Sequence, residues 1–426
     1  MKMLKVLVNA YAVAPNWGSE QGMGWNWISN LSKYCELYVI TEGEWKEEIE
    51  DALKSHPYAA NLHFFYLPVS ERVRRMCWNQ GDWRFYYHYR KWQKAALDLE
   101  RKIIADCARK TTATGVHHDI DVVHHLNMIG FREPGYEWKI KDIPFVWGPI
   151  GGCELMPVNF LDGESVKFKF AVLVKNCLNR LQRKYQYRFR KALNSANGLS
   201  AATKGVWEFI RSYHKKDIVL LNETGCYVKT LPTKALKEDC LDILWVGKFD
   251  YRKQLGLALE IMEALKDCKN VKLHIVGSGA EAEVARYKQM TDKLQIGDKI
   301  VWHGKIPNSD VHRLMRECDL FLFTSIMEGT PHVVLEAIQN ALPVICFDIC
   351  GQSGVVSDSV GIKIPLTTKR QAVRDFTDAI SYLYSHREII QDLSENCAIR
   401  QEELSWDRKA VEMMRIYNNA ILGFSR

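Results

Sequence analysis

Two glutamates separated by seven residues follow an apolar run in the second half of the chain. Residues 324–337 read TSIMEGTPHVVLEA and contain Glu328 and Glu336. The pattern predicts a strand, a loop carrying Glu328, and a helix with Thr330 as N-cap and Pro331 as its first residue. The start of such a helix presents free backbone N–H groups, which suit a diphosphate or a developing negative charge.

Glu336 falls within an otherwise apolar helical stripe. An unpaired carboxylate is costly to bury there, and a ligand hydroxyl would satisfy it. The alternative is that Glu328 is a solvated loop residue and that Glu336 caps a helix or pairs with a neighbouring cation.

A cluster of cations follows the first predicted strand of the second half. Residues 246–254 read VGKFDYRKQ and contain Lys248, Arg252 and Lys253. Cations at the carboxyl end of a strand are common partners of phosphates, although a solvated basic turn would have the same composition.

Residues 117–125 read HHDIDVVHH and invite a metal interpretation. Neighbouring residues of a strand point to opposite faces, so His124 and His125 cannot easily reach one ion. We expect no metal site there.

The elements that must position these residues are alternating short apolar runs and longer amphipathic segments. Such alternation predicts an α/β protein with two doubly wound, Rossmann-like domains facing across a cleft, which is the expected site. The strands are expected at 5–9, 37–41, 62–66, 122–125, 145–147, 198–201, 243–246, 272–276, 299–303, 320–324, 344–347 and 361–364. The predicted domains are residues 1–225 and 226–404, with a helix at 405–426 that could cross back.

Composition excludes several classes of protein. The 426 residues are 47% hydrophobic and 26% charged, which is typical of a globular chain long enough for two cores. The twelve cysteines include no C-x-x-C pair, so a zinc cage or a disulfide framework is not expected and a reducing cytosol fits. No apolar stretch approaches the roughly 20 residues of a spanning helix, so the expected location is cytoplasmic, with any membrane association peripheral on the inner face.

Together the motifs resemble the retaining family 4 glycosyltransferases of GT-B fold. The EGTPHVVLEAI segment matches that family's E-G-x-P-x-x-x-x-E-A pattern, and residues 247–253 match its G-R-L followed by a lysine. Residues 275–279 (IVGSG) match its V-G-x-G turn, and 302–307 (WHGKIP) match its strand-G-x-[VI] element. Lys248 stands where arginine is usual, and Gln254 where glycine is usual.

The resemblance implies that residues 1–225 bind the acceptor and residues 226–404 the donor, and it implies a role for each matching residue. Glu336 would hold the donor ribose. Glu328, with the amides of Gly329 and Thr330, would hold the donor sugar. The remaining implied donor contacts are Lys248 and Lys253 for the diphosphate, Gly277 in its turn, Lys305 and Ile306 near the base, and Gly18 and Ser19 in a glycine-rich loop.

On the reacting side, a histidine at the end of its strand would lie beside the reacting sugar carbon. His125 is the expected catalytic residue together with Glu328, and His124 is the close alternative. Asn127 and Arg132 would line the acceptor side.

The function implied is transfer of a sugar, of hexosyl type and with retention, from a nucleotide-diphosphate sugar to a glycan or lipid-linked acceptor. Such enzymes assemble cell-surface polysaccharides and glycolipids. No cofactor and no essential metal are expected, because two lysines and a helix start can offset the leaving-group charge. The alternatives are another GT-B activity, such as a sugar-nucleotide epimerase or a phosphorylase, and a non-catalytic module that binds sugar nucleotides or nucleic acid.

Two segments of the first half combine cations with apolar and aromatic residues. Residues 165–191 contain nine basic residues and no acidic one, and residues 72–94 mix cations with aromatics. Such faces suit an anionic membrane surface, whereas the alternative is a core-packing helix with solvated charges. No nucleic-acid motif accompanies them, so nucleic acid is not an expected partner.

Overall fold

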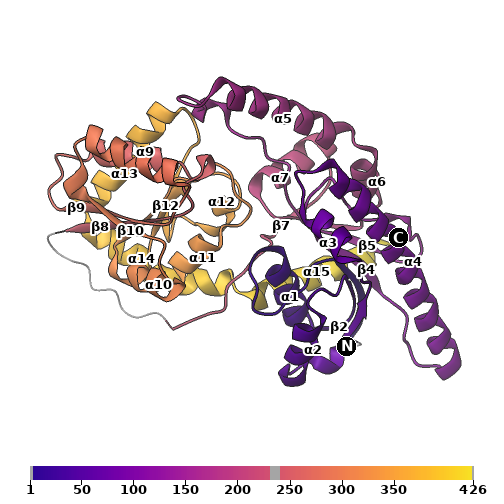
Figure 1. Ribbon diagram of the computed structural model, residues 1–426. Coiled ribbons are helices and arrows are strands. Elements are labelled where there is room, and N and C mark those ends of the chain that lie inside the picture. The colour runs from indigo at the N-terminus through magenta and orange to yellow at the C-terminus, as the bar shows by residue number, and fades with distance from the viewer. Residues whose placement is uncertain (1–2, 231–239, 425–426) are drawn as a thin grey trace.

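The computed structural model describes residues 3–230 and 240–424, which form two α/β domains (Figure 1). The first domain contains a seven-stranded parallel sheet in the order β3-β2-β1-β4-β5-β6-β7. Its strands are β1 (Leu4–Ala10), β2 (Cys35–Thr41), β3 (Leu62–Tyr66), β4 (Val122–Asn127), β5 (Phe145–Ile150), β6 (Gly198–Ala201) and β7 (Val219–Leu220).

The second domain contains a six-stranded parallel sheet in the order β10-β9-β8-β11-β12-β13. Its strands are β8 (Leu241–Val246), β9 (Val271–Val276), β10 (Ile300–Gly304), β11 (Leu320–Phe323), β12 (Val344–Phe347) and β13 (Gly361–Ile364). In both sheets the strand order reverses beside the first strand of the domain, which is the doubly wound topology. The predicted fold class is therefore confirmed.

Helices cover both faces of each sheet. In the first domain they are α1 (Ser19–Leu31), α2 (Lys46–Ser55), α3 (Glu71–Trp78), α4 (Trp83–Thr114), α5 (Val166–Tyr185), α6 (Tyr187–Ser195) and α7 (Lys204–Phe209). In the second they are α8 (Leu255–Ala264), α9 (Glu281–Lys293), α10 (Asn308–Glu317), α11 (His332–Ile338), α12 (Gln352–Val355), α13 (Lys369–Ser385) and α14 (Arg387–Glu403).

The strand pleat divides each core between the two faces of its sheet. In β1, Val6 and Val8 pack with α1 while Leu7 packs with α4 on the other face. In β8, Ile243 packs with α8 while Leu244 packs with α10 and α11. These strands are buried on both faces, which explains why they read as continuous apolar runs in the sequence.

The last helix, α15 (Trp406–Phe424), leaves the second domain and packs against α1 and strands β4, β5 and β6 of the first (Figure 1). The first sheet ends at Leu220 and the second begins at Leu241. The predicted boundary after residue 225 falls between them, and part of that connection (231–239) lies outside the described residues.

Two contacts join the domains near this connection. Lys204 at the start of α7 pairs with Asp348, which follows β12, at 2.9 Å. Glu223, just after β7, accepts hydrogen bonds from Thr330 of the second domain. Farther out, Phe168 of α5 contacts Tyr251 edge to face, with ring centroids 5.0 Å apart.

Candidate functional site

A cavity of about 620 Å³ lies between the domains, and three of the predicted site residues line it, namely Arg132, Glu328 and Gly329. Its second-domain wall includes Arg252, Glu328 and Gly329. Its first-domain wall is made by the loops after β4 and β5, by Glu20 and by the inner side of α5. The cavity therefore lies where the carboxyl ends of the two sheets meet, as expected for doubly wound domains.

The central contact of the second-domain wall is an ion pair between Lys253 and Glu328. Their side chains approach to 2.6 Å and are mostly buried. The Lys253 ammonium also lies 5.2 Å from the centre of the Phe323 ring. Arg252 pairs with Asp250 at 3.0 Å, and Lys248 is exposed. A predicted phosphate-binding cation and a predicted sugar-binding carboxylate therefore neutralise each other in the free protein.

Gly277 holds the ends of three strands together. Its N–H donates to the Gly304 carbonyl at 2.8 Å, and the Gly247 N–H donates to the Val276 carbonyl at 3.0 Å. The φ angle of Gly277 is +143°, and a Cβ there would lie 1.8 Å from the Gly247 carbonyl oxygen. Only glycine fits this position. Lys305 and Ile306 follow Gly304 at the end of β10, with Lys305 exposed and Ile306 partly buried against the core.

Thr330 is hydrogen-bonded to Glu223 of the first domain. The Thr330 N–H and its hydroxyl each donate to a Glu223 carboxylate oxygen, both at 2.6 Å. Helix α11 begins at His332 with Pro331 in the N-cap place, so the prediction of Thr330 as N-cap was wrong by one residue. The amide expected to meet the donor sugar instead meets a carboxylate.

Glu336 lies on α11, partly buried, and burial raises the pKa of its carboxyl. Within the described part of the chain it makes no ion pair. The charge of Lys229 acts on this carboxyl and partly offsets the effect of burial on its pKa.

The two histidines differ in how many of their ring nitrogens have a hydrogen-bond partner among the described residues. His124 is fully buried, with Nε2 against the Gly148 carbonyl at 2.7 Å and Nδ1 against the Tyr417 hydroxyl at 2.7 Å. His125 is also buried, with Nδ1 2.9 Å from a Glu137 oxygen, and its Nε2 has no partner among the described residues. Neither histidine lines the interdomain cavity. Both ring nitrogens of His124 have protein partners, one of them on α15, and its acceptor-side role stays a prediction.

Asn127 connects the end of β4 to the loop before α1. Its carbonyl accepts from the Ala12 N–H at 3.2 Å, and its amide donates to the Ala12 and Glu20 carbonyls at 2.6 and 3.2 Å. The side chain is fully buried and supports the glycine-rich loop, and its acceptor-side role stays a prediction. Gly18 and Ser19 in that loop are exposed, and Ser19 has a φ of +55°.

Arg132 is the predicted acceptor residue that does line the cavity. Its guanidinium stacks 4.5 Å from the centre of the Phe131 ring, and it donates to the side-chain oxygens of Gln182 and Asn179.

Two acidic cavity residues were missed in the sequence. Glu20 accepts from the Ile129 N–H at 3.4 Å, its other oxygen is buried without a partner among the described residues, and burial raises its pKa to about 7. Glu154 accepts from the Thr203 hydroxyl, and burial raises its pKa too. Only the place of Glu20, directly after the Gly-Ser pair, could have signalled its role.

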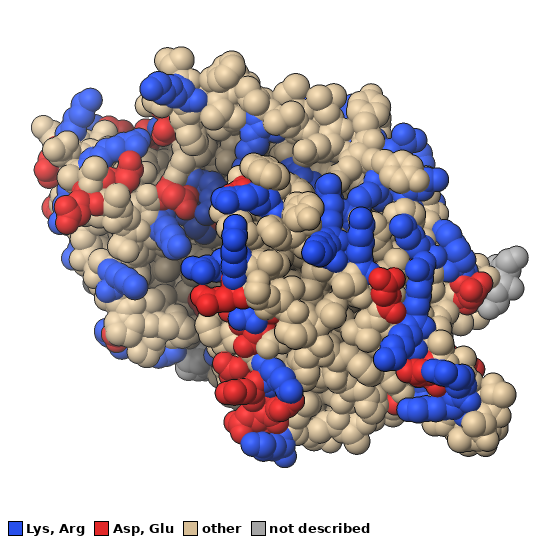
Figure 2. Space-filling model, turned by 45° about the vertical axis from the view of Figure 1, so that its right-hand side comes forward, with Lys and Arg blue, Asp and Glu red and all other residues tan. Residues whose placement is uncertain are grey.

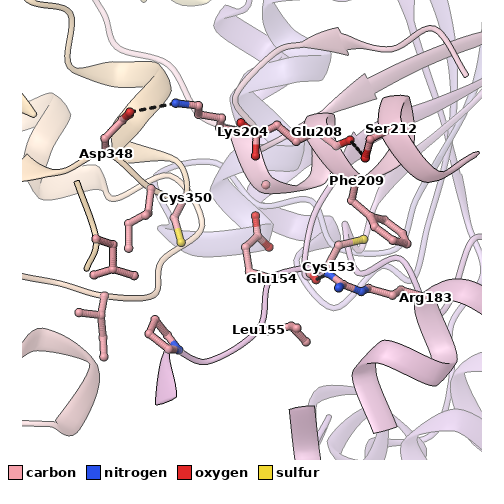
Figure 3. Close-up of a pocket in the computed structure, with 15 residues that line it drawn as sticks. Cys153, Glu154, Leu155, Arg183, Lys204, Glu208, Phe209, Ser212, Asp348 and Cys350 are labelled. Carbon is pink, nitrogen blue, oxygen red and sulfur yellow. Dashed lines mark hydrogen bonds and ion pairs between the residues drawn. The ribbon is translucent and has the colours of Figure 1, made fainter. Parts of the chain in front are cut away.

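A second interdomain cavity, of about 500 Å³, shares Glu154 with the first. Figure 3 shows Glu154 between the Arg183 side of this cavity and the Lys204–Asp348 ion pair that bridges the domains. Glu154 therefore separates two adjoining spaces.

Neither a metal cage nor a membrane span is found in the described ranges. Among residues 3–230 and 240–424, no group of three or more His, Cys, Asp or Glu side chains could hold a metal ion. No helix there combines the length and the apolar character needed to cross a bilayer.

Comparison with known proteins finds that the second domain is similar to glycosyltransferases. Residues 229–400 match the family model of glycosyl transferases group 1. The lipopolysaccharide 1,6-galactosyltransferase of Escherichia coli K12 is 29% identical over 121 residues, which are 28% of this chain and 33% of that protein. The putative teichuronic acid biosynthesis glycosyltransferase of Bacillus subtilis is 31% identical over 146 residues, which are 34% of this chain and 33% of that protein. The matched segments thus span about a third of each relative.

Solved structures resemble the whole chain. A lipopolysaccharide outer core galactosyltransferase aligns with a TM-score of 0.58 at 15% identity, covering 98% of this chain and 99% of that one. A glycosyltransferase of Rickettsia africae aligns with a TM-score of 0.57 at 13% identity, covering 99% of both chains. These likenesses show that the fold is GT-B.

Proposed function

We propose that this protein is a glycosyltransferase that moves a hexosyl group from a nucleotide-diphosphate sugar to a glycan or lipid-linked acceptor. The observation that carries the proposal is the place of Glu328 and Gly329 on one wall of the interdomain cavity, opposite the loops of the first domain, with Lys253 paired to Glu328 behind that wall. The match of residues 229–400 to glycosyl transferases group 1 supports it, as do relatives named for polysaccharide assembly. The E-x₇-E pattern supports a retaining, family 4 mechanism.

In the proposed donor complex, the diphosphate binds Lys253 and the exposed Lys248. Lys253 is already paired with Glu328, so the diphosphate takes over part of that pairing and leaves Glu328 able to accept hydrogen bonds from the donor sugar. The amides of Gly329 and Thr330 face the same sugar once Glu223 withdraws. The base lies near Lys305 and Ile306, beside the Gly277 turn.

Glu336 is proposed to accept hydrogen bonds from the ribose. A partly buried carboxylate with no ion pair in the described chain is costly unless a ligand hydroxyl reaches it.

Charge on the leaving diphosphate would be stabilised by cations and backbone amides. Interactions that strengthen as the sugar–phosphate bond breaks lower the barrier, because they bind the transition state more tightly than the ground state. We propose that no divalent ion is essential. His125 remains a predicted catalytic residue through its free Nε2.

The test is nucleotide binding followed by turnover. UDP, GDP and ADP are screened for an increase in thermal unfolding midpoint, because a ligand of the folded state stabilises it. Loss of the charged contact in Lys253→Ala is expected to weaken the affinity for the stabilising nucleotide about 10- to 100-fold. Glu336→Ala is expected to weaken it as well, and Lys288→Ala, an exposed site on α9, serves as the matched control.

Turnover is then measured with the matching sugar nucleotide, a glycan acceptor and EDTA. Unchanged nucleotide affinity in both Lys253→Ala and Glu336→Ala would contradict the donor site. Acceptor-free epimerisation or a requirement for phosphate would contradict the transfer reaction, and activity lost to EDTA and restored by one divalent ion would contradict metal independence.

A further inference from the structure

The interdomain cavity that contains Glu328 adjoins an outer cavity along the inner side of α5. This outer cavity has a volume of about 700 Å³ and shares Arg132, Lys175 and Asn179 with the cavity that contains Glu328. Its other wall is the start of α4 and the turn before it, including Trp83. The two spaces therefore form one groove that runs from Glu328 to the edge of the first domain.

The middle of this groove is cationic. Lys175 is exposed and makes no ion pair within the described residues. Arg132 is held by neutral amide oxygens and by stacking on Phe131, so no carboxylate among the described residues neutralises it. These two cations are common to both cavities.

The acidic residues of the outer cavity are already paired. Glu133 pairs with Arg90 at 2.7 Å and also with Arg188. Asp82 pairs with Arg84 at 2.6 Å. The groove thus offers two cations without carboxylate partners to an incoming anion.

The outer end of the groove is apolar. Trp83 has 77% of its surface exposed, and Leu178, which lines the same cavity, has 53% exposed. Exposed large apolar side chains next to unpaired cations suit a ligand that is anionic at one point and apolar beyond it.

We propose that this groove binds an acceptor whose sugar is joined to a lipid through a phosphate or diphosphate. The phosphate lies between Arg132 and Lys175, the lipid chain leaves past Trp83 and Leu178, and the sugar points toward Glu328. A guanidinium fixed by amides provides directed donors for phosphate oxygens, and the lysine adds a mobile charge. The inference rests on the proposed function, since it names the acceptor class of that same site.

The test uses farnesyl diphosphate as probe, with inorganic diphosphate and farnesol as its separate parts, and measures binding by calorimetry. Farnesyl diphosphate is expected to bind at least about 10-fold more tightly than inorganic diphosphate. Lys175→Gln is expected to weaken the binding of both diphosphates about 10-fold, because it removes a charged contact to the phosphate. Lys175 is an exposed residue of a surface helix, so its replacement should not disturb the fold. Trp83→Ala is expected to weaken farnesyl diphosphate alone.

Lys253→Ala separates this inference from the proposed donor site. It is expected to lose nucleotide affinity and to keep farnesyl diphosphate binding. Equal affinity for farnesyl and inorganic diphosphate would overturn the groove proposal, as would binding that Lys253→Ala abolishes and Lys175→Gln leaves unchanged. Neither result would contradict the proposed nucleotide site. If no nucleotide binds while farnesyl diphosphate still binds, the proposed donor site is contradicted instead.

Discussion

Three carboxylates line the interdomain cavity, and each is held differently. Glu328 is neutralised by Lys253, Glu154 is bonded by the Thr203 hydroxyl, and Glu20 keeps one buried oxygen with no partner in the described chain. Burial without a cation favours the protonated acid, which accounts for the raised pKa of Glu20. Glu20 is thus a cavity acid whose charge changes near neutral pH.

We predict that Glu20→Gln removes a pH-dependent cost of folding. The pKa of Glu20 is raised from 4.5 to about 7, so the folded protein retains a proton that the unfolded chain releases in this window. Stability of the wild type therefore falls as pH rises from about 5 to about 8, while the neutral amide adds no such slope. The free energy of unfolding of the variant, relative to wild type, is expected to rise by about 1 to 3 kcal/mol across this range in urea titrations.

The exposed Glu47→Gln on α2 is the control, and its difference from wild type should not vary with pH. A pH-independent difference for Glu20→Gln would show that Glu20 is ionised at all these pH values.

Residue roles were predictable from the sequence only where the motif is local. The segments around Lys253 and Glu328 are continuous, so their meeting at strand ends followed from the α/β pattern. The contact of His124 with Tyr417 could not be predicted, because the two residues are 293 positions apart in the chain. Glu223 carried no signal, because its bond to Thr330 spans 107 residues.

At the scale of elements, α15 is the connection that ties the end of the chain to the first domain. It packs over β4, β5 and β6, and its Tyr417 hydroxyl reaches the buried His124 ring. A helix at 405–426 that could cross back to the first domain was expected from the sequence. The two-residue strand β7 was not, because so short a segment has no periodicity to detect.

We predict that Tyr417→Phe destabilises the protein. The change keeps the ring that packs in the core but leaves a His124 nitrogen buried without its partner, which is expected to cost about 1 to 3 kcal/mol. The measurement is urea unfolding. Tyr382→Phe, at an exposed site on α13, is the control and should change stability by less than about 0.5 kcal/mol. Equal effects of the two substitutions would mean that the His124 hydrogen bond adds nothing to the docking of α15.

For the whole molecule, the main asymmetry is the basic and apolar surface of the first domain. In Figure 2, Lys and Arg side chains gather across the middle of the face turned forward, with acidic side chains mainly toward its lower and left edges. Helix α5 (Figure 1) buries only Val172, Asn176 and Asn179, so the alternative of a core-packing helix does not hold for its apolar residues. A stripe of them is exposed: Val166, Phe170, Leu173, Val174, Leu178, Leu181 and Tyr185.

The structure also corrects which residues belong to that surface. Arg183 donates to the Cys153 carbonyl at 3.0 Å, and Arg188 pairs with the buried Glu133, so neither cation is free for a membrane. Among the aromatics of residues 72–94, Phe85, Tyr89 and Trp92 belong to the core, while Trp83 and Tyr87 are exposed.

We propose that this surface attaches the first domain to an anionic membrane, and we predict two separable effects. Lys167, Arg180 and Arg190 are exposed, and changing all three to glutamine is expected to weaken binding to phosphatidylglycerol vesicles about 100-fold, at about 1 kcal/mol per cation near the surface. Phe170→Ser with Leu181→Ser is expected to weaken binding through lost apolar insertion. Co-sedimentation measures both, with Lys269, Lys288 and Lys293 of the second domain changed to glutamine as the matched control.

Because salt screens charges and not apolar contacts, binding of the serine variant should still fall as salt rises, whereas the glutamine variant should lose most of that dependence. Equal binding of all variants, or indifference to anionic lipid, would make α5 an ordinary solvated helix.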